Sequence, residues 1–317
     1  MANLVMIPLD GSTLAEQALP LGVSLAQQIS SDSVVQLVQV VPKPSNAVSY
    51  ISTPNGDISP LELVDAFWGS AQSYLSKMKE ELAEVGIPVE TCILEGDVGQ
   101  VLADLANEQE TSYIVMSTHG RGGLSRWALG SVADQLLHLS KRPLIIMRPQ
   151  GAMQVTMPRA LHLENNLSQL KRIVVPLDGS PLAEQVLPHV KKLARAYDAE
   201  LLLFRSVSLV PPSMIGADVA LLEKKLYEVN RNEARDYLKR IKVNLQIQGF
   251  KVSIEVGGAP TADAILRYAT QVDADLIAMA THARGAIGRL IWGSVTDGVI
   301  RAGQMPVLVT KAETKES

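Results

Sequence analysis

The sequence contains little of what several large classes of protein depend on. A single cysteine, Cys92, stands among 317 residues, which excludes an intramolecular disulfide and a thiolate metal cluster. Cys92 falls in the alternating stretch VETCILEG, so we expect a buried structural thiol rather than a reactive one. A membrane-spanning helix needs about eighteen consecutive apolar residues, and no such run occurs. The chain also opens on a strand-like segment without a signal-peptide pattern, and we therefore expect a cytoplasmic protein.

Aromatic rings and concentrated charge are scarce as well. Three Phe and three Trp are too few for a surface that stacks the bases of a single nucleic-acid strand. The net charge is −4, and the acidic and basic residues are dispersed along the chain, so no basic face for nucleic acid is indicated. We expect neither a nucleic-acid partner nor a membrane partner. Hydrophobic residues are plentiful, at 47%, which is enough for two ordinary cores.

What the sequence does contain is a repeat. Residues 7–20 read IPLDGSTLAEQALP, and residues 175–188 read VPLDGSPLAEQVLP. A second pair of phrases, MSTHGRGGLSRWALGSVADQL at 116–136 and MATHARGAIGRLIWGSVTDGV at 279–299, follows at nearly the same offset. The two halves therefore share one order of elements and differ mainly in the length of their loops.

This repeat predicts two copies of a domain of ordinary size. The expected boundaries are a first domain at 1–149, a linker at 150–170 that holds one short helix at most, a second domain at 171–312 and a tail at 313–317. The segment at 42–60 is rich in Pro, Ser, Asn and Gly, and it predicts a long surface loop.

Each half alternates short apolar runs with longer helical patterns. In the first half we expect strands at 4–9, 34–41, 89–94, 112–118 and 143–148, and helices at 14–29, 61–85, 99–109 and 132–140. The second half repeats the strands as RIVVPL, AELLLFRSV, KVSIEV, DLIAMAT and PVLVT. Continuous apolar runs are typical of parallel strands that are covered on both faces. The alternation predicts an α/β fold with a doubly wound, five-stranded parallel sheet in each half. Pro20 and Pro188 fall inside helical patterns and predict a kink in the first helix of each half.

In such a sheet, ligands bind where the carboxyl ends of the strands meet the N-termini of the helices. The phrase PLDGS follows the first expected strand of each half, and it has two interpretations. Asp10 and Asp178 can accept hydrogen bonds from a ribose or a base, or they can brace the loop. Ser12 and Ser180 are typical helix N-caps. From these residues alone, both interpretations stay open.

The phrase THGRGGLSRWALGS follows the fourth expected strand and ends at a helix start. Its glycines let the backbone approach a ligand, and the N–H groups near Gly130 and Ser131 favour a phosphate site. The alternative is a helix-capping pattern, S-x-x-D, formed by Ser131 with Asp134 and by Ser294 with Asp297. The phrase is neither a P-loop nor a dinucleotide-binding motif. His119 and His282 lack a paired acid or nucleophile within the motif, so we expect no catalytic residue and no metal site.

Together, PLDGS and STHGRGGLSRWALGS resemble the universal stress protein family, and the doubled arrangement resembles its tandem members. Nucleotide-binding members of that family carry Gly-x2-Gly-x9-Gly-Ser/Thr on this loop, which wraps the ribose and phosphates of ATP. Their strand-one acid and the backbone at the end of strand two hold adenine and ribose. The resemblance implies a Rossmann-like, adenine nucleotide alpha hydrolase-like fold whose two domains pack as a pseudo-dimer through their fifth strands.

For the first half, the resemblance implies an ATP or ADP site, with AMP as a further candidate, in which Ser117 replaces the first glycine. Its residues are Pro8, Leu9, Asp10, Ser12, Val40, Met116, Ser117, His119, Gly120, Arg121, Gly122, Gly130, Ser131 and Val132. The second half implies a degraded site, because Ala280 and Ala283 replace two glycines and Ser206 replaces the strand-two valine. Its residues are Pro176, Asp178, Ser206, Ala280, His282, Ala283, Gly293, Ser294 and Val295.

The function that the resemblance implies is a cytoplasmic stress-response regulator, in which a bound nucleotide, with or without Mg²⁺, alters conformation or association. A homodimer and an unnamed protein partner are compatible with it. Two alternatives stay open: a slow ATPase or nucleotidyl-transfer enzyme, and a protein-interaction module that binds no nucleotide.

Overall fold

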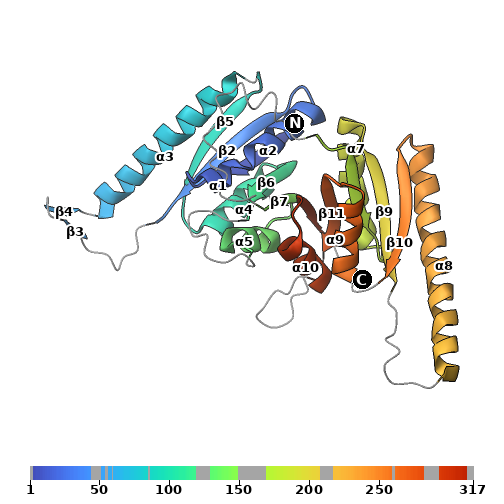
Figure 1. Ribbon diagram of the computed structural model, residues 1–317. Coiled ribbons are helices and arrows are strands. Elements are labelled where there is room, and N and C mark those ends of the chain that lie inside the picture. The colour runs from blue at the N-terminus through green and yellow to red at the C-terminus, as the bar shows by residue number, and fades with distance from the viewer. Residues whose placement is uncertain are drawn as a thin grey trace. The chain divides into compact units, whose positions relative to one another are not determined.

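The computed structural model describes residues 3–43, 51–53, 56–58, 60–84, 86–118, 129–148, 169–207, 217–258, 261–281 and 293–312, without the side chains of 51–61 and 217–223. The chain divides into two compact units, Met1–Ser168 and Gln169–Ser317, which are described one at a time below (Figure 1). Each unit holds one copy of the repeat. The predicted pairing of the units through their fifth strands stays a prediction, as do the exact domain boundaries.

The first unit is built on a five-stranded parallel sheet with the order β7-β6-β1-β2-β5. Its strands are β1 (Leu4–Pro8), β2 (Val34–Val41), β5 (Val89–Glu95), β6 (Tyr113–Ser117) and β7 (Leu144–Met147). The chain moves outward from β1 in one direction through β2 and β5, and then in the other direction through β6 and β7. The sequence therefore reverses its course between β1 and β6, which is where ligands of such sheets bind.

The helices of the first unit are α1 (Thr13–Glu16), α2 (Leu19–Ile29), α3 (Pro60–Ala83), α4 (Val98–Glu108) and α5 (Ser131–Leu139). Because parallel crossovers are right-handed, the reversal at β1 places the helices of the two directions on opposite faces of the sheet. Figure 1 shows α3 lying along β5, while α4 and α5 pack against each other. The central strands β1 and β6 are covered on both sides, and Val5, Met6 and Ile7 have no exposed surface.

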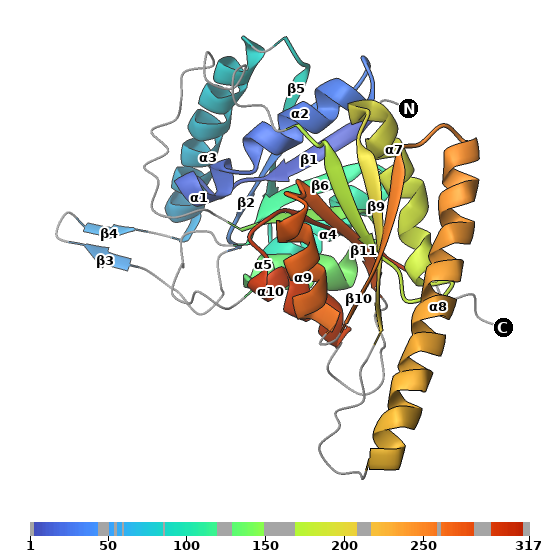
Figure 2. The same ribbon diagram turned by 45° about the vertical axis from the view of Figure 1, so that its right-hand side comes forward.

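The second unit repeats this sheet with the order β10-β9-β8-β11-β12. Its strands are β8 (Arg172–Pro176), β9 (Glu200–Val207), β10 (Val252–Gly258), β11 (Leu276–Thr281) and β12 (Val307–Lys311). Its helices are η1 (Ala183–Val186), α7 (Leu187–Tyr197), α8 (Ala217–Ile247), α9 (Thr261–Gln271) and α10 (Ser294–Ala302). Figure 2 shows α8 running alongside β10, and α8 also packs on β9. The predicted fold of each half is confirmed.

In each unit the first helix is divided into two helical segments, and the proline lies in the first turn of the second segment. In the first unit α1 ends at Glu16, and α2 starts afresh at Leu19 with Pro20 in its first turn. In the second unit the short η1 precedes α7, and Pro188 lies in the first turn of α7. Proline has no backbone N–H to lose in a first turn, so a regular α-helix begins at the proline in each unit.

Three other expectations need comment. The segment at 42–60, predicted to be a loop, contains a short antiparallel hairpin of β3 (Ile51–Thr53) and β4 (Gly56–Ile58). Cys92 is half-buried rather than buried, and burial raises the pKa of its thiol, which keeps the thiol protonated. The linker expected at 150–170 lies almost wholly outside the described residues.

No helix in the described ranges combines the length and the apolar character that crossing a membrane requires.

Candidate functional site

The loop after β1 is held by a pair of local hydrogen bonds. Asp10 accepts the N–H of Ser12 on Oδ1 at 2.9 Å, and Ser12 Oγ accepts the N–H of Ala15 at 3.2 Å as the N-cap of α1. Gly11 between them has φ +79°, in the left-handed region that favours glycine. Leu9 anchors the loop to the sheet, because its N–H donates to the Val38 carbonyl at 2.8 Å. The capping interpretation of Ser12 is therefore correct, and Asp10 does brace the loop.

The second unit repeats this turn after β8. Asp178 Oδ1 accepts the N–H of Ser180 at 2.8 Å, and Ser180 Oγ accepts the N–H of Ala183 at 3.1 Å. Bracing does not exclude a ligand role, since an ionised carboxylate can accept several hydrogen bonds. The two interpretations of PLDGS are thus compatible, and each aspartate is held in one position at the carboxyl end of a central strand.

The loop that returns from β6 reaches the sheet again at Gly130, the N-cap of α5. The Gly130 N–H donates to the Thr118 carbonyl at 3.0 Å, and a Cβ on Gly130 would lie only 2.2 Å from that carbonyl oxygen. No real Cβ contact is that short, so residue 130 must be glycine for the start of α5 to lie against the end of β6. Met116, Ser117 and Thr118, which form that end, are all buried.

The alternative interpretation of this phrase, an S-x-x-D helix cap, is wrong in both units. Gly130 and Gly293 occupy the N-cap positions, neither helix has a side-chain cap hydrogen bond, and Ser131 and Ser294 are the first helical residues instead. A capping box needs the serine itself at the N-cap. The first N–H groups of α5 and α10 are therefore not capped by a side chain, and such groups, with the helix dipole, favour an anion.

Other predicted residues lie near the turn after the first strand or near the start of α5 or α10. Pro8 pairs with Val38 in the sheet, and Val40 lies near the carboxyl end of β2. In the second unit Pro176 ends β8 and Ala280 lies next to the end of β11, and Ser206 on β9 donates from Oγ to the Gly258 carbonyl at 2.9 Å. Val132 and Val295 follow the first serines of α5 and α10. The predicted residues outside the described ranges are His119, Gly120, Arg121, Gly122, His282 and Ala283.

Comparison with known proteins decides the family. The family model described as "Universal stress protein family" matches residues 1–148 and again residues 169–311. The chain belongs to the universal stress protein family.

Relatives agree with this membership. Universal stress protein MJ0531 of Methanocaldococcus jannaschii is 30% identical over 154 residues, which make up 49% of this chain and 89% of that protein. Universal stress protein Mb2028c of Mycobacterium bovis is 24% identical over 212 residues, 66% of this chain and 64% of that protein. The crystal structure of a universal stress protein from Archaeoglobus fulgidus has a TM-score of 0.69 and 20% identity, and the match covers 98% of this chain and 99% of that one. At that identity the structural match shows the fold alone.

We call the turn formed by Asp10 and Ser12, and its copy at Asp178 and Ser180, the Asp–Ser turn. In the helix that follows this turn, a glutamate pairs with a tyrosine, which the sequence did not predict. The Tyr74 hydroxyl donates to Glu16 Oε1 at 2.8 Å, and Glu16 is only 7% exposed. Burial raises the pKa of Glu16 despite the opposing effect of the Tyr74 hydrogen bond, and the charges of Glu81 and Asp10 raise it further. Within the described residues, Glu16 Oε2 is buried and finds no hydrogen-bond partner.

The same pair recurs in the second unit. The Tyr237 hydroxyl donates to Glu184 at 2.9 Å, and burial is the main reason that the pKa of Tyr237 is raised. Both glutamates belong to the repeated LAEQ stretch, and the tyrosines recur at the offset of the second pair of phrases. That regular spacing was the available signal, but the partners are more than fifty residues apart, and only the packing of α3 or α8 brings them together.

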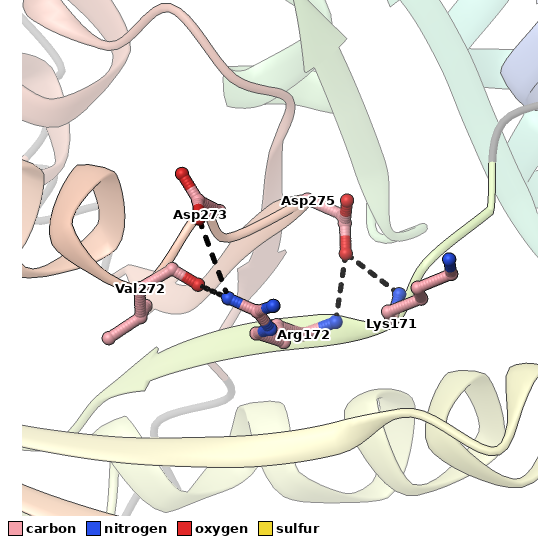
Figure 3. Close-up of polar contacts among 5 residues, drawn as sticks. All are labelled: Lys171, Arg172, Val272, Asp273 and Asp275. Carbon is pink, nitrogen blue, oxygen red and sulfur yellow. Dashed lines mark hydrogen bonds and ion pairs between the residues drawn. The ribbon is translucent and has the colours of Figure 1, made fainter.

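The amino ends of β8 and β11 in the second sheet are joined by a cluster of polar contacts. Asp275, just before β11, accepts the backbone N–H groups of Lys171 and Arg172 at 2.8 and 2.9 Å (Figure 3). The Arg172 guanidinium in turn donates to the Val272 carbonyl and lies 3.8 Å from Asp273. This cluster therefore stabilises the sheet at the amino ends of its strands, whereas the candidate site lies at their carboxyl ends.

Metal ligands are not grouped in the described part of the chain. Its His, Cys, Asp and Glu side chains form no cluster of three or more that could hold an ion. The absence of a metal site of the protein's own stays a prediction.

Proposed function

We propose that the first unit binds an adenine nucleotide, ATP or ADP, at the carboxyl ends of β1 and β6. The observation that carries the proposal is the contact of Gly130 with the Thr118 carbonyl, where a Cβ would have only 2.2 Å. This contact holds the N-terminus of α5, which no side chain caps, against the end of a central strand. An uncapped helix N-terminus at the switch point of a parallel sheet is suited to phosphate. Universal stress proteins often bind adenine nucleotides, which favours this ligand over a plain anion.

Each part of the proposed site has a physical role. The backbone N–H groups of Ser131 and Val132 would hold the phosphates, with the helix dipole adding positive potential. Asp10, fixed by its bond to the Ser12 N–H, would accept hydrogen bonds from ribose or adenine. Val40 would line the adenine position at the end of β2. The loop residues His119, Gly120, Arg121 and Gly122 are included in the proposal through the family motif alone.

The proposed action is regulatory. A nucleotide that binds one conformation or one associated state more tightly than another shifts the population toward it. We infer that the protein acts in this way in the cytoplasm, where members of the family generally work, and that Mg²⁺ enters the site only with the nucleotide.

Calorimetric titration with ATP tests the proposal, and the repeat supplies matched controls. We expect about one nucleotide per chain and a loss of at least tenfold in affinity in Gly130→Ala, because the added methyl pushes the start of α5 away from β6. Gly293→Ala, where the nearest described atom would lie 3.9 Å from the Cβ, should keep the wild-type affinity. Asp10→Asn and Asp178→Asn form a second pair that places no bulk in the site.

Circular dichroism establishes that each variant is folded. A folded Gly130→Ala protein with wild-type ATP affinity would contradict the proposal, as would a wild-type protein that binds no adenine nucleotide. Steady phosphate release by catalytic amounts of protein would instead support the slow ATPase.

A further inference from the structure

The second unit contains a cleft that is lined largely by charged residues. It lies at the carboxyl ends of β8 and β9, facing α8, and has a volume of about 490 Å³, which is within the range of small-molecule sites. Its lining includes Asp178 and Gly179 from the Asp–Ser turn and Arg205 from β9. The opposite wall comes from α8, with Glu233, Tyr237 and Arg240.

Arg205 is held in place by its surroundings. Its guanidinium lies over the Tyr237 ring, 5.1 Å from the ring centre, and Tyr237 is itself fixed by its hydrogen bond to Glu184. Gly179 makes room for the guanidinium, because a Cβ there would come within 2.9 to 3.1 Å of three guanidinium atoms. Gly179 also has φ +92°, so a side chain at this position would be disfavoured twice.

This fixed guanidinium has unused hydrogen-bonding capacity. Arg205 is half-buried, and a guanidinium offers five N–H donors. Among the residues that the structure describes, its only charged or aromatic partner is the Tyr237 ring, and no carboxylate lies within 4.0 Å of it. A planar guanidinium that is already ordered loses little entropy when it binds a carboxylate or a phosphate in bidentate fashion.

The first unit differs at this position. Strands β2 and β9 correspond residue by residue, so that Gln39 occupies the place of Arg205, while Tyr74 occupies the place of Tyr237. Across from them, Ser70 stands where the second unit has Glu233. Ser73 likewise stands where the second unit has Asp236, while Lys77 keeps the positive charge of Arg240. The second unit therefore adds a guanidinium on the strand and two carboxylates on the helix, on the same backbone frame.

The acidic residues of the cleft restrict what can reach Arg205. Asp178 is engaged by the Ser180 N–H, and Asp236 on α8, which also lines the cleft, is paired with Lys239 at 3.1 Å. Glu233 and Asp178 are exposed. Arg205 and Arg240 supply two guanidinium groups to the same lining. A ligand with one anionic group and a cationic or hydrogen-bond-donating end can pair with both signs of charge in this mixed lining.

We propose that the second unit binds a small polar metabolite in this cleft, with a carboxylate or phosphate group of the ligand held by Arg205. The acidic side chains favour a ligand whose other end is cationic. The proposal rests on the second unit alone and not on the nucleotide site of the first. Position 39/205 would then be the residue that gives the two copies different ligands.

The test uses the full chain and three probes: succinate, inorganic phosphate and 4-aminobutanoate. Arginine side-chain NMR signals, assigned to Arg205 by their loss in Arg205→Gln, should shift with at least one probe at millimolar concentration. Succinate and phosphate distinguish a carboxylate ligand from a phosphate ligand, and a stronger response to 4-aminobutanoate than to succinate would support the cationic end.

The variants separate binding from structure. Arg205→Gln, which installs the residue of the first unit, should weaken probe binding at least tenfold by calorimetry, and Arg205→Lys should recover only part of it. Arg195 stacks on Phe250 at 5.0 Å but is not part of the cleft lining, so Arg195→Gln removes the same charge and a similar contact and should leave binding unchanged. The proposal is overturned if no probe binds the wild type, or if folded Arg205→Gln binds as well as the wild type. Repeating the titration in Gly130→Ala keeps its outcome separate from that of the nucleotide site.

Discussion

Gly130 and Gly293 occupy the same place in the two units, at the N-cap of the helix that follows the fourth main strand, but the space around them differs. A Cβ on Gly130 would collide with the Thr118 carbonyl, whereas a Cβ on Gly293 would make only ordinary contacts with Thr281 and Thr296. The first copy therefore depends on glycine, whereas no described atom imposes glycine on the second. The N-cap glycine is present in both units, but the described neighbours leave no room for a side chain only at Gly130.

The comparison extends to what the copies share. Both keep the Asp–Ser turn after the first strand and the Glu–Tyr pair behind it. They differ on the second main strand, where Gln39 of the first unit corresponds to Arg205, which lines the cleft of the second unit. The shared elements hold the backbone, and the variable ones decide which chemistry that backbone presents.

The largest effect on stability should come from adding a methyl group at the two N-cap glycines. Gly130→Ala should lower the free energy of unfolding of the first unit by about 3 kcal/mol, as overpacking against backbone does. Gly293→Ala should lower that of the second unit by under about 0.5 kcal/mol, as substitutions away from such contacts do. Urea unfolding followed by a probe in each unit measures both. Equal losses at the two positions would remove the steric difference between the copies.

A smaller effect should follow from deleting the tyrosine hydroxyls. Tyr74→Phe leaves the buried Glu16 without its hydrogen bond, which should destabilise the first unit by about 2 kcal/mol. Tyr237→Phe should have a smaller effect, because Glu184 is only half-buried and water can replace the lost bond. The ratio of the two losses, measured by thermal unfolding, checks this. A greater loss from Tyr237→Phe would reverse the expected order.

The pH dependence of the first unit should reflect Glu16. Because its pKa is raised in the folded state, the folded protein binds this proton more tightly than the unfolded chain does. Glu16 therefore weakens folding above its folded pKa, and this penalty fades as the pH falls to the unfolded value near 4.5. Glu16→Gln should accordingly stabilise the first unit by about 1 kcal/mol at pH 7 and by much less at pH 4. Unfolding curves at the two pH values that show the same difference would refute this cause.

The smallest effect on stability should come from removing polar side chains at the amino ends of the strands. Asp275→Ala removes two bonds to backbone N–H groups in the second unit and should cost about 1 kcal/mol, since the site is partly exposed. Ser112 is the corresponding residue of the first unit, and it makes one 3.3 Å bond to Asn3. Ser112→Ala should therefore cost about half as much or less. Equal losses in chemical denaturation would mean that Asp275 adds nothing beyond what Ser112 provides.

The sequence was sufficient for the parts of the fold that depend on local pattern. Apolar runs and their spacing predicted the five main strands of each unit, and the repeated phrases located the turn formed by Asp10 and Ser12 and its copy at Asp178 and Ser180. These features lie within one strand and the turn that follows it. The hairpin of β3 and β4 was missed because its two strands are only three residues each, too short for an alternating pattern to be distinguished from a loop.

Features that depend on long-range packing were beyond the sequence. The S-x-x-D spacing suggested that Ser131 caps α5, but the N-cap is set by where the backbone turns against Thr118. The Glu–Tyr pairs require α3 and α8 to lie over the first helices of their units. The importance of Arg205 likewise depends on Tyr237, which comes from a helix across the cleft.

The freedom around Gly293 has a consequence for how such a tandem protein can change over time. A gene duplication produces two copies, and a copy diverges most readily where substitutions leave folding intact. At residue 293 a methyl group would make only ordinary contacts with the described residues, whereas the first unit loses packing at the first methyl group on residue 130. Among the described contacts, the helix start of the second unit therefore tolerates substitution at residue 293, whereas that of the first unit is restricted to glycine by its own backbone.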